Sequence, residues 1–377
     1  MALQYPTDTT ATTNLGAYKR NILSIKEFVG PNVHIMAMIK ANAYGHGLID
    51  CARTAVDAGA PMLGVAFTAE GLQLREAGID IPVLILSPES YDRFGDMLEH
   101  HLTPTLTSVS MLREIERHVR ATNKSCPVHV NVDTGMTRVG VSENDVFELV
   151  EAAHATPGVI LEGLYTHFPN ADEDNEEYTR EQIGRFGAIV ESIHNKGIHP
   201  VYIHAANSAG TLKYPEAHFN MVRPGIMTYG LEPYPGSNDV LSMEQVLSWH
   251  TRIGFLKEVP AGTRVSYGGS FITERPSILA TAPVGYGDGY RRLLSNRGKA
   301  LVNGAYAPIA GRICMDQTVF DVTDAGSVHV GDTITLIGSD GHAKITAEDH
   351  ARLTGTINYE IVTGIANRVS RAIVPTT

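Results

Sequence analysis

Short apolar runs alternate with longer stretches of helical periodicity over about the first 240 residues of the chain. A short apolar run bounded by turn residues is typical of a buried strand, whereas apolar residues spaced three and four apart indicate an amphipathic helix. Eight strands are predicted, at His34 to Lys40, Met62 to Phe67, Val83 to Ser87, Pro104 to Thr107, Val128 to Asp133, Leu161 to His167, Val201 to Asn207 and Met221 to Pro224. This alternation indicates βα units around a parallel sheet.

Two of the intervening stretches carry helix-end signals. One follows Asn14, a favourable N-cap residue, and another stops before Gly197, which suits a left-handed C-terminal cap. Eight βα units in about 220 residues fit a TIM (β/α)8 barrel, whose typical length is ~250 residues. A doubly wound parallel sheet is the alternative that this pattern leaves open.

The pattern changes after about residue 240 to alternating runs separated by glycine turns. Strands are predicted at Trp249 to Glu258, Val265 to Phe271, Ile278 to Val284, Lys299 to Val302 and from Ala307 onward. Asn303-Gly304 favours a two-residue hairpin turn, because both residues accept positive φ. Only Thr346 to Leu353 has a helical pattern here. We therefore expect a barrel domain over residues 1–240 and a mainly β domain over residues 241–377.

Composition narrows the classes of function. The chain has 377 residues, of which 43% are hydrophobic and 19% charged, as in folded globular proteins. A net charge of −11 without a long basic run argues against nucleic acid and anionic membranes as partners. The 3 widely spaced cysteines form no CxxC pair, and we find neither a signal peptide nor an apolar run of ~20 residues. A cytoplasmic location is expected.

Polar residues follow the ends of the predicted strands, where the functional residues of TIM barrels gather. Lys40 ends the first strand; burial there could lower its proton affinity, as Schiff-base lysines require, although solvent-exposed lysines are commoner. Arg138 lies in DTGMTRVG after the fifth strand. It could orient a carboxylate or phenolic oxygen, or form a surface ion pair with Asp133.

Candidates for anion binding follow the later strands. Asn207 and Ser208 open a predicted helix after the seventh strand. Arg223 and the Gly225-Ile226 loop follow the eighth, where TIM barrels often bind phosphate, although Arg223 could instead form a barrel-end ion pair. For His167, at the end of the sixth strand, a buried structural role is the commoner one.

The second domain offers Tyr267 in VSYGGSF and Met315 in CMDQT, and each also fits a purely structural role. GYGDGY, residues 285–290, lacks the GxGxxG spacing and reads as a turn. The 16 histidines show no metal-ligand spacing, so we expect no metal.

In this order, the segments resemble the alanine racemases, fold-type III enzymes that depend on pyridoxal 5′-phosphate (PLP). KANAYGHG is the most specific motif, and DTGMTRVG, ANSAG, VRPGI, VSYG, GYGDG, CMDQ and NYE extend the resemblance over almost the whole chain. The resemblance implies interconversion of L-alanine and D-alanine, a supply of D-alanine for peptidoglycan, and a homodimer whose active sites use both subunits.

The resemblance also assigns roles to residues. Lys40 would bind PLP covalently and act as the base toward D-alanine, and the partner subunit's Tyr267 would act as the base toward L-alanine. A phenol has an unperturbed pKa of ~10, so the second base needs surroundings that stabilise its anion. Arg223 would face the pyridine nitrogen without giving up its proton. The other implied residues are Tyr44, His167, Asn207, Ser208, Gly225, Ile226 and Tyr359 for the cofactor, Arg138 and Met315 for the substrate, and Asp172, Tyr286, Arg292 and Arg312 for the entrance.

One position departs from the family pattern. Many members carry a carbamylated lysine two residues before the aspartate of DTGM, where this chain has Asn131. Asparagine brings no charge, so we hypothesise that a small anion such as chloride lies beside Arg138. The RVSR ending, where RVPR is usual, is expected to touch no site residue. Alternatives are a broader alanine/serine racemase, a PLP-dependent decarboxylase, a non-catalytic PLP-binding protein and a metal hydrolase.

Overall fold

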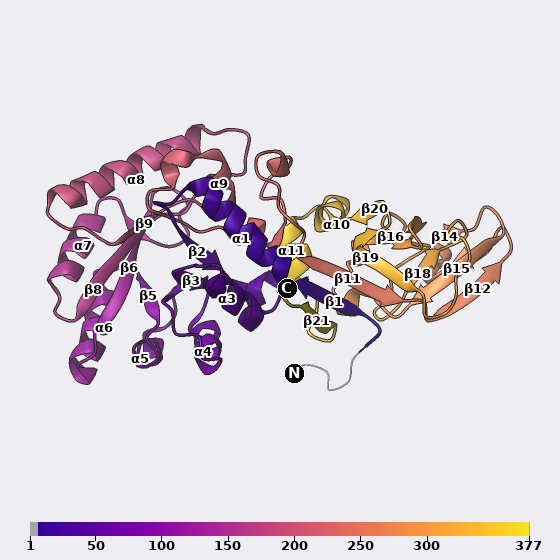
Figure 1. The fold of residues 1–377 in the computed structure, drawn as a ribbon, viewed down its shortest axis with the longest axis horizontal. Helices are drawn as coiled ribbons and strands as arrows, with labels where there is room; N and C mark the ends of the chain where they lie inside the picture. The colour runs from indigo at the N-terminus through magenta and orange to yellow at the C-terminus, as the bar shows by residue number, and fades with distance from the viewer. Residues whose placement is uncertain (1–6, 377) are drawn as a thin grey trace. The chain divides into compact units, whose positions relative to one another are not determined.

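The structure, a computed structural model, describes residues 7–376 and separates into two compact units (Figure 1). The barrel unit comprises Tyr18–Ala43 and Gly47–Met243. Within the described residues, the β unit comprises residues 7–17, Tyr44–His46 and residues 244–376.

A closed ring of parallel strands forms the centre of the barrel unit (Figure 1). Within the described residues its eight strands are β2 (His34–Met38), β3 (Met62–Val65), β4 (Val83–Ile85), β5 (Thr103–Leu106), β6 (Cys126–Asp133), β8 (Val159–Tyr165), β9 (Tyr202–His204) and β10 (Met221–Val222). β5 pairs with β6 and closes the ring, while the short β7 (Val141–Ser142) pairs beside β6. Closure confirms the predicted TIM barrel, because a doubly wound sheet has two open edges.

Helices surround this barrel (Figure 1). They are α1 (Leu15–Val29), α3 (Leu48–Asp57), α4 (Thr68–Glu76), α5 (Phe94–Glu99), α6 (Val109–Thr122), α7 (Val146–Ala155), α8 (Glu177–Asn195) and α9 (Ser208–Lys213). The segment labelled α2 (Lys40–Tyr44) is a short left-handed turn after β2. Every residue of β3, β4 and β5 is buried, which explains their continuous apolar runs. Both helix-end signals are confirmed: the Asn14 side chain accepts from the Ala17 N–H at 3.0 Å, and Gly197 has φ of 77°.

Strand β9 is shorter than predicted. It ends at His204 rather than at Asn207. The reason is that the next carbonyl, that of Ala205, accepts a hydrogen bond at 3.1 Å from the Arg223 side chain. After His204, the backbone therefore bonds to the side chain of Arg223, a residue of the candidate site.

The β unit is built from a mixed sheet and two small antiparallel sheets within the described residues. The mixed sheet contains β1 (Thr10–Asn14), β11 (Leu247–Arg252), β16 (Lys299–Val302), β17 (Ala305–Pro308), β19 (Thr333–Asp340), β20 (Ala343–Ile345) and β21 (Ser370–Val374). The small sheets contain β12 (Phe255–Val259), β15 (Ser277–Ala282) and β18 (Thr318–Asp321), and β13 (Arg264–Val265) with β14 (Phe271–Ile272). β1 runs parallel to β21 and antiparallel to β11, so these N-terminal residues, expected in the barrel domain, lie in the sheet of the β unit.

Three details of the β unit bear on the sequence predictions. The Asn303-Gly304 hairpin is confirmed, with φ of 51° and 77°. The strand predicted over Val265 to Phe271 is instead a hairpin, because Gly268 and Gly269 turn the chain with φ of 73° and 54°. A second helix, α11 (Asn358–Thr363), follows α10 (Ala347–Thr354); with only 6 residues it is too short to show a helical period.

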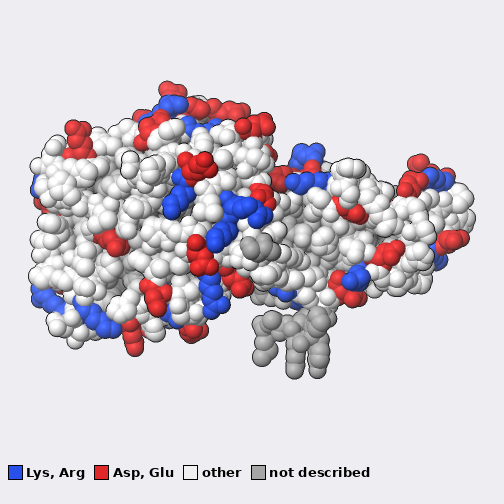
Figure 2. All heavy atoms as spheres, viewed as in Figure 1, with Lys and Arg blue, Asp and Glu red and all other residues white. Residues whose placement is uncertain are grey.

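Acidic and basic side chains are interspersed on the face of the molecule in Figure 2. Among the helices of the described residues, none combines the length and the apolar character that crossing a membrane requires.

A buried histidine makes the β unit sensitive to acid. His350 on α10 is 3% exposed, and its ring contacts Tyr290 at 5.7 Å between centroids. Burial lowers the pKa of His350 to about 4, although the neighbouring Asp349 opposes this shift. The ring is therefore neutral in the folded protein at pH values where an unfolded histidine is already protonated.

We expect the stability contributed by neutral His350 to be complete above pH ~6.5 and to be lost as the pH falls toward about 4. The loss amounts to about 3 kcal/mol of unfolding free energy. His350→Gln, which does not titrate, should flatten this pH dependence. Urea unfolding from pH 7 to 4.5, followed by the fluorescence of Trp249, the only tryptophan, measures it. Equal pH slopes for variant and wild type would contradict the assignment.

Candidate active site

Lys40 is followed by a left-handed turn. The four residues 41–44 all have φ between 52° and 55°. This conformation costs L-residues about 1–2 kcal/mol each, so the surroundings must hold it. Glu70 on α4 does so in part, because its carboxylate accepts hydrogen bonds from the N–H groups of Ala41 at 2.6 Å and Ala66 at 2.8 Å. Glu70 thus ties the turn to the end of β3, a role that no motif in the sequence indicated.

The half-buried Lys40 amine lies among charges that favour its neutral form. Burial lowers the pKa of Lys40, and the positive charges of Arg138 and Arg223 lower it further, whereas Glu70 opposes them. A neutral amine is a nucleophile and a base. Lys40 is therefore partly buried and has a lowered pKa, as the first of the two alternatives from the sequence predicted, and is not a fully solvated lysine.

Arg223 is the buried centre of the site, with 4% of its surface exposed. Nη1 donates to Nδ1 of His204 at 2.9 Å, and Nη2 donates to Nδ1 of His167 at 3.0 Å and to the Thr166 carbonyl at 2.8 Å. Because Arg223 can only donate, both imidazoles accept through Nδ1 and are neutral there. Burial, followed by the charge of Arg223, holds the pKa of His167 and of His204 well below the usual range.

The Arg223 guanidinium remains charged at neutral pH. Burial lowers its pKa to about 10, which is still well above 7. It also lies over the ring of Tyr165, at 5.2 Å from the centroid. No described residue accepts a hydrogen bond from its Nε, so this N–H is available to a ligand.

A relay of side chains continues from Arg223 through the barrel. His204 Nε2 donates to Nδ1 of His129 at 2.9 Å, and His129 Nε2 donates to the Glu162 carboxylate at 3.2 Å. The donor arginine at one end and the acceptor carboxylate at the other fix both tautomers. No motif in the sequence indicated His129 or Glu162; their inward alternation along β6 and β8 was the available signal.

Ser208 joins the loops after β9 and β10. Its buried hydroxyl oxygen accepts from the N–H groups of Gly225 at 2.9 Å and Met227 at 3.4 Å. With its acceptor positions occupied, the hydroxyl can donate its own proton to an acceptor such as a phosphate oxygen. Ile226, between the two donors, is buried and begins a 3-10 turn. Asn207, expected to bind the cofactor, caps α9 by accepting from the Gly210 N–H at 2.9 Å.

Asn131, Arg138 and His167 line one small cavity together with Met136. Asn131 is buried and Arg138 is exposed. The Asp133 carboxylate does not pair with the arginine there but accepts from the backbone N–H groups of Gly135 and Thr137, at 3.0 and 2.9 Å. The surface ion pair considered from the sequence is therefore absent among the contacts of these described residues.

In the β unit, Tyr267 lies in the turn between β13 and β14 and is 69% exposed. The preceding Ser266 has φ of 62°, and its hydroxyl donates to the Arg312 carbonyl at 2.6 Å. The guanidinium carbon of Arg312 lies 3.4 Å from where a Cβ on Gly268 would stand. Arg312, a predicted entrance residue, thus packs against the turn that carries Tyr267, the predicted base.

Two further predicted pairs come together in the β unit. Tyr286 and Arg292 line one pocket, and the rings of Tyr44 and Tyr359 lie 6.0 Å apart. Asp172, in the barrel unit, is exposed.

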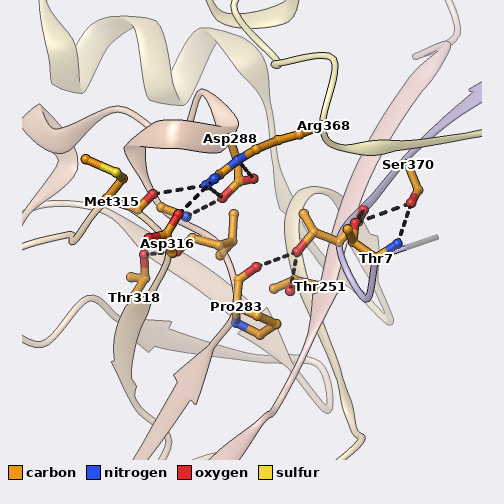
Figure 3. A network of polar contacts seen from close by, with 12 residues as sticks. Thr7, Thr251, Pro283, Asp288, Met315, Asp316, Thr318, Arg368 and Ser370 are labelled. Atoms are coloured by element: carbon orange, nitrogen blue, oxygen red, sulfur yellow. Dashed lines mark hydrogen bonds and ion pairs between the residues drawn. The ribbon is translucent and has the colours of Figure 1, made fainter. Parts of the chain in front are cut away.

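The Met315 loop is bonded to the GYGDGY turn. The N–H of Tyr286 donates to the Cys314 carbonyl at 3.0 Å, and the N–H of Gly287 donates to the Met315 carbonyl at 2.9 Å. Any Cβ on Gly285 would overlap these carbonyls, which explains the glycine. The RVSR ending was expected to touch no site residue, but this is wrong: Arg368 donates to the Met315 carbonyl at 3.2 Å (Figure 3).

Comparison with known proteins covers both units. The sequence model described as "Alanine racemase, N-terminal domain" matches residues 13–233, and "Alanine racemase, C-terminal domain" matches residues 246–373. Alanine racemase from Halothermothrix orenii is 43% identical over 363 residues, with 96% of each chain covered. The enzyme named alanine racemase in Methanococcus maripaludis is 38% identical, with 96% of this chain and 97% of that protein covered.

Solved structures are similar over nearly the full length. Alanine racemase from the D-cycloserine producer Streptomyces lavendulae has a TM-score of 0.92 and 35% identity, covering 99% of this chain and 98% of that one. The Bacillus anthracis enzyme with bound L-Ala-P has a TM-score of 0.91 and 35% identity, covering 99% and 96%. With both family models matched in order and relatives similar over almost their whole length, the chain belongs to the alanine racemase family.

Proposed function

We propose that the protein is a PLP-dependent alanine racemase that interconverts L-alanine and D-alanine. The observation that carries this proposal is the cluster in the barrel unit, where Lys40 has a lowered pKa beside two arginines and Ser208 completes an anion-binding loop. Membership of the alanine racemase family supports the choice of alanine. No observation favours a decarboxylase, a metal hydrolase or a non-catalytic carrier.

The donors present fit PLP. The Lys40 amine suits the cofactor's aldehyde, the Ser208 hydroxyl with the backbone N–H of Ile226 suits its phosphate, and the Nε–H of Arg223 suits its pyridine nitrogen. Tyr44 and Tyr359 are proposed as further phosphate contacts. When bound, the cofactor supplies an electron sink for the substrate carbon that loses its proton.

Two bases on opposite faces of the substrate carbon exchange its proton. Lys40 takes or returns it on the D-alanine face, aided by the lowered pKa of its amine. Tyr267 does so on the L-alanine face, and the Arg312 guanidinium lies beside the turn that carries it. Arg223 donates a hydrogen bond but, with a pKa of about 10, no proton, which limits electron withdrawal from the substrate carbon and favours rapid reprotonation.

Arg138 and the N–H of Met315 are proposed to bind the substrate carboxylate. A guanidinium and a backbone N–H both donate to carboxylate oxygens, and a charged donor makes the stronger bond. Asp172, Tyr286, Arg292 and Arg312 are proposed to line the entrance.

The active enzyme is proposed to be a homodimer in which the β unit of one subunit completes the site of the other. Tyr267 is 69% and Met315 54% exposed, so both side chains are accessible to a second copy. The thiols of Cys51, Cys126 and Cys314 form no disulfide, in keeping with the proposed cytoplasmic location. The proposed role of the enzyme there is to supply D-alanine for peptidoglycan.

Circular dichroism of L-alanine, L-serine and L-lysine incubated with the holoenzyme tests the function. We expect loss of the alanine signal to the racemic limit, with slower or no change for the other two. Equal rates with serine would support the broader racemase, and release of carbon dioxide without racemisation would refute both.

A chloride ion is proposed to lie in the cavity between Asn131 and Arg138. Arg138 and Arg223 make this region positive, and Asn131 offers an uncharged N–H donor where the family often has a negative charge. Replacing chloride by gluconate at constant ionic strength should raise the KM for alanine several-fold.

The Asn131→Asp variant supplies its own charge and should be insensitive to this exchange. In crystals soaked with bromide, an anomalous peak is expected beside Arg138. A high-resolution map with only water there would refute the proposal.

A further inference from the structure

Arg368, just before β21, holds together two loops of the β unit (Figure 3). Its Nε and Nη2 donate to the two oxygens of Asp288, at 2.7 and 3.0 Å, and Nη1 donates to Asp316 at 2.8 Å. Nη2 also donates to the Met315 carbonyl, at 3.2 Å. One guanidinium thus binds three acceptor residues through four contacts.

These acceptors belong to the turn and the loop that carry two proposed site residues. Asp288 is 7% exposed and closes the Tyr286–Asp288 turn by accepting from the Gly285 N–H at 2.8 Å. On the other side, the Cys314 carbonyl is held by the Tyr286 N–H at 3.0 Å. A trans peptide is planar and its N–H points opposite to its C=O, so fixing this carbonyl fixes the direction of the Met315 N–H.

Arg368 and the Met315 loop pack closely against the backbone of the Tyr286–Asp288 turn at Gly287. A Cβ on Gly287 would lie 2.6 Å from Nη2 of Arg368 and 3.1 Å from the Met315 carbonyl. A side chain at this position would have to displace the Arg368 guanidinium or the Met315 carbonyl, which both pack directly on the backbone of the turn.

We propose that Arg368 is a positioning residue, which orients the Met315 N–H toward the substrate carboxylate and sets the place of the Tyr286 ring. This inference rests on the proposed function, because it takes the Met315 N–H as a contact to alanine. Arginine is required for geometric reasons: its planar fork reaches both Asp288 oxygens and two further acceptors at once, whereas a lysine ammonium has no such fixed array.

Arg371 provides a matched control. It lies in the same RVSR ending and donates to a backbone carbonyl of the β unit, that of Ile365, at 2.8 Å. It contacts neither Met315 nor the Tyr286–Asp288 turn in the described residues. A purely structural role for Arg368 should make the Arg368 and Arg371 variants behave alike.

The experiment compares Arg368→Ala, Arg368→Lys and Arg371→Ala holoenzymes with wild type. We expect the KM for alanine to rise about tenfold to a hundredfold in both Arg368 variants, with PLP content and absorbance unchanged. Hydrogen exchange of the peptide spanning residues 311–317 should accelerate in the Arg368 variants. Both quantities should stay at wild-type values in Arg371→Ala.

Three outcomes of this comparison distinguish a positioning role of Arg368 from the alternatives. A raised KM with faster exchange supports the positioning role. Wild-type KM and exchange in both Arg368 variants, or the same change in Arg371→Ala, overturns it. If the wild-type holoenzyme does not racemise alanine, the proposed function fails instead, and hydrogen exchange still reports whether Arg368 orders the Met315 loop.

Discussion

Replacing Lys40 by alanine is expected to lower kcat/KM for alanine by at least about 10⁴-fold, because one amine serves both as the covalent attachment and as one base. The fold should survive, since the left-handed turn is held through the backbone by Glu70 and not by the Lys40 side chain. Racemisation followed by circular dichroism measures the loss.

Lys196→Ala is the control, because Lys196 lies at the surface in an ion pair with Glu151 and contributes little to stability. Borohydride treatment of the wild-type holoenzyme, followed by peptide mass mapping, should label Lys40 and no other lysine. Substantial activity in Lys40→Ala, or a label elsewhere, would sink the assignment.

Replacing Tyr267 by phenylalanine should slow racemisation in both directions by about 10²–10⁴-fold, because one of the two bases is removed and nothing else changes shape. The Lys40 face should still exchange protons. In D2O, D-alanine should therefore lose its α-proton while staying D-alanine, and L-alanine should keep its α-proton. Proton NMR with chiral analysis separates these results. Exchange of L-alanine at the wild-type rate would remove Tyr267 from its role.

A mixing experiment extends this test to the subunits. Lys40→Ala and Tyr267→Ala chains are each expected to be inactive, but a heterodimer with shared sites regains one complete site. With random exchange, about a quarter of the wild-type activity should return. No recovery after proven subunit exchange would show that both bases come from one chain.

The barrel could be predicted from the sequence because its strands are buried on both faces and its helices are amphipathic, so each element carries its own pattern. The positions of Lys40, Arg223 and Ser208 followed from that pattern, since parallel strands present their carboxyl ends at one rim. The motif resemblance then supplied roles that spacing alone left open.

The contacts that orient these residues could not be predicted in the same way. His129 and His204 are 75 residues apart, and Arg368 and Asp288 are 80 apart, so no local pattern links them. The turn after Lys40 even opposes local preference, because alanine rarely adopts positive φ. Such strain is set by the surrounding fold and concentrates where function requires it.

β1 lies between β11 and β21 in one sheet, but the ribosome makes β1 long before it makes either partner strand. Thr10 pairs with His250 and Ser370, residues that the ribosome adds much later. At about 5–20 residues per second, roughly twenty to seventy seconds pass before the last partner emerges. The barrel strands can pair in that interval, whereas the backbone N–H and C=O groups of β1 remain without their partner strands. Its sequence TATTN, mostly threonine, leaves the nascent strand little apolar surface through which to aggregate.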